Sequence, residues 1–214
     1  MLLYRMVGVL ALVLGLLLAP SSAGLPVATA QSASSNSQLA LREAMRKLWE
    51  DHVTWTRLYI VSAVAGLPDK DATAQRLLRN QADIGSAVAS YYGQPAGDKL
   101  TALLRTHILT AADLIAAAKQ GDSAKVKDVS ARWYANADDI AAFLNGANPS
   151  NWPLGSMKSM MHEHLDLTLA EARARLNGNW SADIAAYDKV HRQILEMADM
   201  LSTGIISQFP QKFQ

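Results

Sequence analysis

The sequence predicts an all-α fold, a six-helix bundle made of three repeated antiparallel helical hairpins. From Leu39 onward the chain is rich in Ala, Leu, Arg, Lys and Gln, which are strong helix formers. In this region prolines fall only between the helical stretches, and no segment keeps the alternation of apolar and polar residues that is typical of a half-buried strand. Glycines and capping residues divide this helical chain into six segments.

The first predicted hairpin covers residues 39–92. Its first helix runs from about Leu39 to Ala65 and stops at Gly66-Leu67-Pro68, because glycine favours the left-handed conformation that ends a helix and proline cannot continue one. Its second helix follows a cap at residues 69–71 and ends near Tyr92-Gly93.

The second and third hairpins have the same kinds of boundary. A proline opens the third and fifth helices in their first turns, at Pro95 and Pro153, and the glycines Gly121 and Gly178 end them. Polar residues cap the helices that return. The remaining four helices are therefore expected at about 95–120, 123–145, 153–177 and 181–208.

The N-terminus has the pattern of an export signal. Residues 1–5 carry one positive charge, and residues 6–19 form an uncharged apolar stretch that is short for a membrane span. Small residues offer cleavage sites at 21–23 and 28–30, and the second, Ala28-Thr29-Ala30, fits the Ala-x-Ala rule better. We expect a signal peptide or membrane anchor at 1–30, a flexible leader at 31–38 and the helical bundle domain at 39–214, in a secreted or periplasmic protein.

Composition excludes several classes of function. The chain has no cysteine, which rules out disulfides and thiolate metal sites. Its 20 Lys+Arg balance 19 Asp+Glu, so the charge predicts no nucleic-acid partner. It contains no glycine-rich phosphate loop and no nucleotide fingerprint, and an enzymatic activity is left open but not favoured. Membrane contact is expected only through an uncleaved N-terminal segment.

Three histidines are placed in register within the predicted hairpins. The same interval separates each histidine from the glycine that ends its helix, in the pairs His52 and Gly66, His107 and Gly121, and His164 and Gly178. In the returning helices, nearly the same interval separates those glycines from Asn80, Asn136 and His191. At about 1.5 Å of rise per residue, all six polar positions are roughly 20 Å from their turns. If the turns lie at one end of the bundle, these polar side chains share one layer.

Such a layer favours metal binding inside the bundle. Neighbours three and four residues away place the four histidines of the layer on mostly apolar helix faces. Imidazole nitrogen suits Zn, Cu, Fe or Ni, and helical bundles build metal sites from inward-facing side chains at one level. The predicted ligands of a single transition-metal ion are three or four histidines, with Asp188 as a ligand or as the group that orients His191. These residues are His52, His107, His164, His191 and Asp188.

Two other interpretations of the layer remain open. Buried His and Asn side chains can form a hydrogen-bonded layer that fixes helix register in a structural, interaction or envelope-stress protein without binding anything. The same groups can also line a pocket for a small organic ligand. In the metal interpretation, the protein serves in sensing, storage or scavenging.

Four stretches of the chain resemble a known family. They begin at Leu48, Asn136, Glu163 and Gln208 and read LWEDHVTWTR, NADDIA, EHLDLT and QFPQKF. The chain resembles a family of small bacterial all-helical proteins without an established function, some of which carry a glutamate-kinase or acetylglutamate-kinase label. This resemblance covers nearly all of the chain after the predicted signal. It implies an all-helical fold and supplies no catalytic residues.

Overall fold

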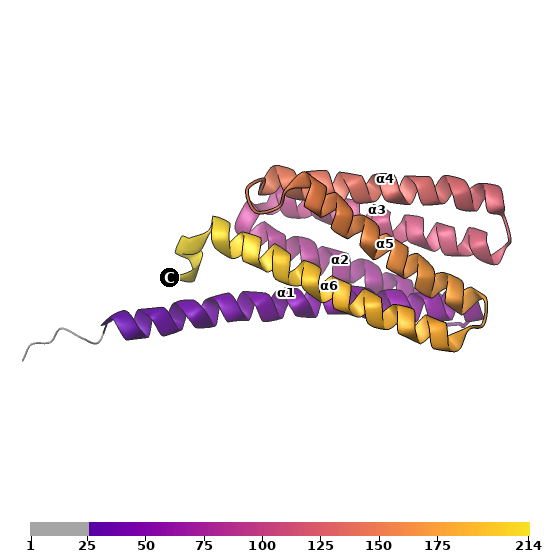
Figure 1. Cartoon of the computed structure of the whole chain (residues 1–214), viewed down its shortest axis with the longest axis horizontal. Helices are drawn as coiled ribbons and strands as arrows, with labels where there is room; N and C mark the ends of the chain where they lie inside the picture. Colours follow the sequence, from indigo (N-terminus) through magenta and orange to yellow (C-terminus); the bar gives the residue numbers. More distant parts are fainter. Residues whose placement is uncertain (1–25) are drawn as a thin grey trace, which may run out of the picture.

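The computed structural model describes residues 26–214, and every regular element in this part of the chain is a helix (Figure 1). The all-α prediction is therefore confirmed. A short 3-10 helix, η1, follows the six α-helices at Pro210–Phe213. The six are α1 (Pro26–Ala65), α2 (Lys70–Tyr92), α3 (Gln94–Lys119), α4 (Ser123–Ala147), α5 (Leu154–Leu176) and α6 (Trp180–Gln208).

The start of α1 differs from the prediction. The helix begins at Pro26 rather than near Leu39, so residues 31–38, expected as a flexible leader, are helical. Extending an existing helix costs little compared with nucleating one, and the segment contains no internal proline or glycine. The first turns of α1 extend beyond the rest of the bundle (Figure 1). Most of the predicted signal, residues 1–25, lies outside the described residues, and cleavage after Ala30 stays a prediction.

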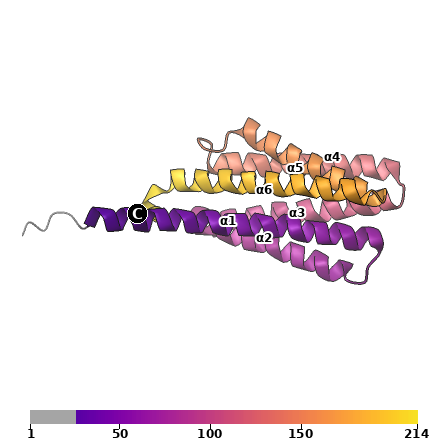
Figure 2. The same ribbon diagram turned by 60° about the horizontal axis from the view of Figure 1, so that its bottom comes forward.

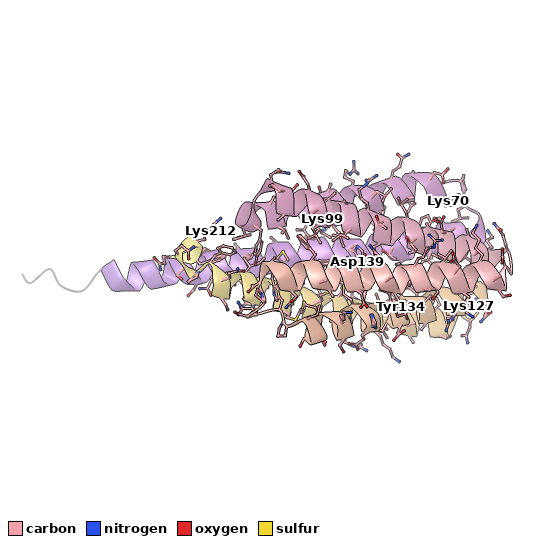
Figure 3. The ribbon with its side chains drawn as sticks, turned by 90° about the horizontal axis from the view of Figure 1, so that it is seen from above. Lys70, Lys99, Lys127, Tyr134, Asp139 and Lys212 are labelled. Atoms are coloured by element: carbon pink, nitrogen blue, oxygen red, sulfur yellow. The ribbon has the colours of Figure 1, made fainter. Side chains whose placement is uncertain are left out.

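The helices pack mostly as sequential antiparallel neighbours. Each contacts the next along the chain, and α6 returns to pack against α1 (Figures 1 and 2). α1 also contacts α3 and α5 and is thus the most central helix. In Figure 3, Lys70 at the start of α2 and Lys127 near the start of α4 lie toward one end, and Lys212 lies at the other. The turns before α2 and α4 are therefore at the same end of the bundle.

One large apolar core connects all six helices. It includes Trp49, Trp133, Trp152, Leu165 and Ile194, each no more than 4 % exposed. Among the described helices, α3 alone is long and apolar enough to cross a membrane by length and composition. Its buried positions include His107 and Thr110, and it packs between α2 and α4, as a core helix of a globular bundle does.

Helices α2 and α3 approach each other closely at two glycines, Gly85 and Gly97. A Cβ added at Gly85 would lie 2.7 Å from the backbone oxygen of Gly97, and one added at Gly97 would lie 2.5 Å from the backbone oxygen of Gly85. Both distances are below van der Waals contact and involve backbone atoms that cannot rotate away. This crossing therefore requires residues without side chains.

We expect Gly85→Ala to lower the free energy of unfolding by about 1–3 kcal/mol, because the added methyl group must push the two helices apart. Gly146→Ala is the matched control, since a Cβ on this helical glycine meets nothing within 4 Å. That change should leave stability equal or raise it by up to about 1 kcal/mol. Urea unfolding followed by circular dichroism measures both. Equal effects of the two substitutions would contradict the close approach.

Candidate functional site

Three of the predicted histidines meet inside the bundle. His52 on α1, His107 on α3 and His164 on α5 are only 3–4 % exposed. The ring centroids of His52 and His164 are 5.7 Å apart, and those of His107 and His164 are 6.5 Å apart. Trp49 packs edge-on against His52, and Trp133 lies 5.1 Å from His107. We call His52, His107 and His164 the histidine layer.

His107 is held by the side-chain amide of Asn136 on α4. Nδ1 of His107 lies 3.0 Å from Oδ1 of Asn136, and the amide nitrogen donates to the backbone carbonyl of Leu103 at 3.2 Å. A carbonyl only accepts, so the amide nitrogen must face Leu103 and the amide oxygen must face the histidine. Nδ1 of His107 therefore carries the proton, and Nε2 has a free lone pair.

His164 has the same arrangement with Gln193 on α6. Nδ1 of His164 lies 3.1 Å from Oε1 of Gln193, whose amide nitrogen donates to the carbonyl of Met160 at 3.1 Å. The tautomer is fixed in the same way, with the proton on Nδ1. In the described part of the chain, no protein group donates to Nε2 of His107 or His164. Both Nε2 atoms are thus available as acceptors or metal ligands.

His52 has only part of this arrangement. Asn80 on α2 donates to the carbonyl of Leu48 at 3.0 Å, but its oxygen accepts from Gln81 rather than from the histidine. Nδ1 of His52 and Oε1 of Gln81 are both buried without a hydrogen-bond partner among the described residues. Gln81 nevertheless lies close enough to raise the pKa of His52, as a hydrogen-bond acceptor does, against the lowering by burial. Donor and acceptor are present here without the bond between them.

His191 and Asp188 do not join the layer, which corrects the expected four-histidine arrangement. His191 is half-buried at the surface, where Nε2 lies 3.0 Å from Oε1 of Glu50, and Asp188 is exposed. The inward position on α6 belongs to Gln193. Two residues along a helix correspond to a rotation of about 200°, so His191 and Gln193 face opposite ways.

A constant spacing in the sequence identifies the amides correctly. Each histidine of the layer precedes the glycine of its turn at one fixed interval, and a second fixed interval leads from that glycine to Gln81, Asn136 or Gln193. A search for histidines among the returning helices selects His191, which breaks this second interval. Allowing any polar side chain at a fixed spacing would have selected Gln193.

Burial keeps the histidine layer neutral. It lowers the pKa of His107 to about 3 and that of His164 to about 4. Burial also lowers the pKa of His52 well below 6.5, and the nearby His164 and His107 lower it further, because two charged imidazoles would repel each other. At neutral pH the three rings thus have the uncharged form that binds metals or accepts hydrogen bonds.

A cavity extends from the histidine layer toward the end of the bundle where α1, α3 and α5 end in turns. Its volume is about 80 Å³, counted as the space open to the centre of a water molecule. All three histidines line it, together with mostly apolar side chains of α1 to α5, such as Ile60, Leu114 and Leu176. The layer therefore forms the polar inner end of a mostly apolar cavity.

A buried ion network lies between the layer and the turns, on the side of α6. Arg57 on α1 contacts Oε1 of Glu171 and Oδ1 of Asp183, both at 2.8 Å, and Arg175 contacts Oδ2 of Asp183 at 3.3 Å. Both carboxylates are 1 % exposed. Burial raises the pKa of Glu171 to about 7 against the opposing effect of Arg57. The network ties α1 to α5 and α6.

These features define a six-helix bundle with a buried histidine layer held by side-chain amides. Comparisons with protein-family models, with curated proteins and with solved structures find no match for this chain. The resemblance drawn from the sequence thus stays a prediction. Within residues 26–214, no three His, Asp or Glu side chains lie close enough together, as placed, to hold a metal ion.

We expect the free energy of unfolding to fall as the pH is lowered from about 6.5 to about 4.5. In this range the unfolded histidines bind protons while the folded ones, with their lowered pKa values, do not, so the slope reaches about 1.4 kcal/mol per pH unit for each histidine. Glu171 acts in the opposite direction, because its carboxyl binds a proton more readily when folded. Three histidines outweigh one carboxyl. Urea unfolding at pH 7.5, 6.5, 5.5 and 4.5 measures the slope.

Two variants separate these contributions. His107→Gln should reduce the slope by about 1.4 kcal/mol per pH unit, since one titrating group is removed. Glu171→Gln should make the slope steeper, because the opposing carboxyl is gone. Stability that stays constant or rises toward pH 4.5 would show that the histidines are not buried as neutral groups.

Proposed function

We propose that the protein binds one transition-metal ion, of the class that prefers imidazole (Zn, Cu, Fe or Ni), through Nε2 of His52, His107 and His164. The observation that carries this proposal is the fixed tautomer of His107 and His164. Metal-binding histidines usually donate their other ring N–H to a carbonyl or carboxylate, which orients the ring and leaves the coordinating lone pair free. Asn136 and Gln193 supply those acceptors here.

The ring separations are near those of imidazoles on a common ion. With Zn–N bonds of about 2.0–2.1 Å, two histidine ring centres on one tetrahedral ion are about 5 Å apart. The separations of 5.7 Å for His52–His164 and 6.5 Å for His107–His164 are wider, so binding requires these two pairs of rings to close by about an ångström and His52 and His107 to approach each other as well. The His52 ring is the one free to reorient, because neither its Nδ1 nor the side-chain oxygen of Gln81 has a hydrogen-bond partner among the described residues. A bond between them would give His52 the orientation of the other two histidines.

The roles first predicted for His191 and Asp188 pass to other groups in this proposal. Gln193 and Asn136 orient the rings, as Asp188 was expected to do for His191. Three protein nitrogens leave at least one position on the ion for water or another small ligand, as in metal sites that remain open. The expected roles in sensing, storage or scavenging, and the location outside the cytoplasm, belong to this same proposal.

We further propose that the bundle consists of three copies of one hairpin. Gly66, Gly121 and Gly178, with φ of 67°, 71° and 68°, end the first helix of each pair. At each turn the residue after the glycine donates its N–H to a carbonyl five residues earlier. In each pair, an amide of the returning helix donates to the carbonyl four residues before the histidine. A single ancestral hairpin would account for the three histidines at one level.

A structural role of the layer is the second candidate. The observation that favours it is that Asn136 and Gln193 each bond both a histidine and a backbone carbonyl of the neighbouring helix, which fixes the register of α3 with α4 and of α5 with α6. These bonds form without any ion. In that case the protein is a non-enzymatic structural or interaction protein.

Metal binding is tested on the purified protein without a histidine tag. Titration calorimetry with Zn²⁺, Cu²⁺, Ni²⁺ and Fe²⁺, followed by elemental analysis, should give one ion per chain for at least one of these metals. His164→Gln should abolish that binding, whereas His162→Gln should keep it. His162 lies on the same helix but half-exposed beside Asp138, so it is the matched control. No stoichiometric ion, or equal losses in the two variants, would refute the metal proposal.

The two candidates differ in how His107→Asn changes stability. A metal at 100 times its dissociation constant stabilises the folded protein by about 2.7 kcal/mol. If the layer binds metal, His107→Asn should remove most of that metal-dependent increment in unfolding experiments with and without the ion. The structural role is supported instead if the ion does not stabilise the wild-type protein and His107→Asn lowers the free energy of unfolding equally with and without the ion.

A further inference from the structure

The cavity above the histidine layer combines unused acceptors with an apolar wall. Nε2 of His107 and of His164 accepts no hydrogen bond from the described residues, and both rings line the cavity. Of the hydroxyls in the lining, those of Thr56 and Thr168 donate to the carbonyls of His52 and His164 at 2.7 and 2.8 Å, and those of Tyr59 and Ser130 make no hydrogen bond with the layer. Unmatched acceptors in an apolar cavity require a donor from outside the protein.

A buried donor lies in the same wall. The indole N–H of Trp133 has no acceptor among the described residues, although Trp133 is 2 % exposed and its ring lies 5.1 Å from that of His107. The Nε1 atom of Trp133 is fully covered by neighbouring atoms, so the polar groups offered to a ligand are the histidine acceptors, which suit the donating hydroxyl of an alcohol or phenol.

The rest of the cavity wall disfavours a charged ligand. Side chains such as Ile108, Leu114 and Leu169 line the cavity, and no carboxylate is among the described residues that line it. The charged side chain in the lining is the exposed Arg173 on α5. A charged group at the inner end would lose its hydration without gaining an opposite charge, which is costly.

The size of the cavity limits the ligand. Because the 80 Å³ counts only the space where the centre of a water molecule can lie, the room for atoms is larger, and it accommodates several waters or an organic molecule with one ring. From the cavity, its acceptors and its walls, we infer that the protein binds a small, neutral, mainly apolar alcohol or phenol, with the hydroxyl group on the histidine layer.

This site goes beyond the metal proposal and does not need an ion, because the acceptors are present in the protein alone. A metal on the Nε2 atoms would compete with the hydroxyl or take it as a ligand. The test therefore uses metal-free protein, prepared with a chelator that is then removed. Failure of the metal titration leaves this test unaffected, and the reverse also holds.

Phenol and toluene are the decisive pair of probes, because they have nearly the same shape and differ in one hydroxyl. A cavity that binds only by hydrophobic contact prefers toluene, since an unpaired buried hydroxyl costs free energy. We expect phenol to bind at least tenfold more tightly than toluene in titration calorimetry. In ¹⁵N spectra of the histidines, phenol but not toluene should shift the Nε2 signals of the layer.

Variants that fill the cavity test whether the ligand binds inside it. Ala111→Leu on α3 adds three carbons to the lining and should weaken phenol binding at least tenfold. Ala116→Leu makes the same change on the exposed face of α3 and should leave binding unchanged. If Ala111→Leu does not fold, Ala172→Leu on α5 fills the cavity from the opposite helix. Absence of phenol binding, preference for toluene, or binding that Ala111→Leu and Ala172→Leu do not weaken would overturn the inference.

Discussion

The bond between a buried histidine and a side-chain amide is the interaction on which the centre of this bundle depends. In the pairs His107–Asn136 and His164–Gln193, one amide satisfies the imidazole with its oxygen and a helix carbonyl with its nitrogen. Removing either partner would leave a buried polar atom without a bond, which costs more than the bond itself contributes. The amides therefore fix two properties together: the register of two helix pairs and the tautomers of His107 and His164.

The fold could be predicted from the sequence because its signals are local. Glycines at residues 66, 121 and 178 adopt the left-handed conformation that ends a helix, and the helices between the turns have the expected composition. The exception is the start of α1. Serine and glutamine at residues 31–38 are common both in flexible leaders and in exposed helices, so local composition could not decide between them.

The candidate site could be predicted only in part, because its geometry depends on rotation about the helix axis. A shift of one or two residues hardly changes the height of a side chain but turns it by about 100° or 200°. His52, His107 and His164 lie together inside the bundle as expected, because all three precede the glycine of a turn at the same interval, and their role as metal ligands stays a prediction. For His191 the prediction has the right height and the wrong face. The cavity depends on how side chains of five helices pack, which no spacing along the chain describes.

The central position of α1 determines when the molecule can be completed. Its partners on α6 lie far away in sequence: Arg46 pairs with Asp199, 153 residues later, and Arg57 pairs with Asp183, 126 residues later. Contacts between distant residues form slowly, because a long loop must close first. Helix α1 is synthesised long before α6, so the side chains of α1 that pair with α6 wait for the last helix, and α1 cannot complete its packing until α6 arrives.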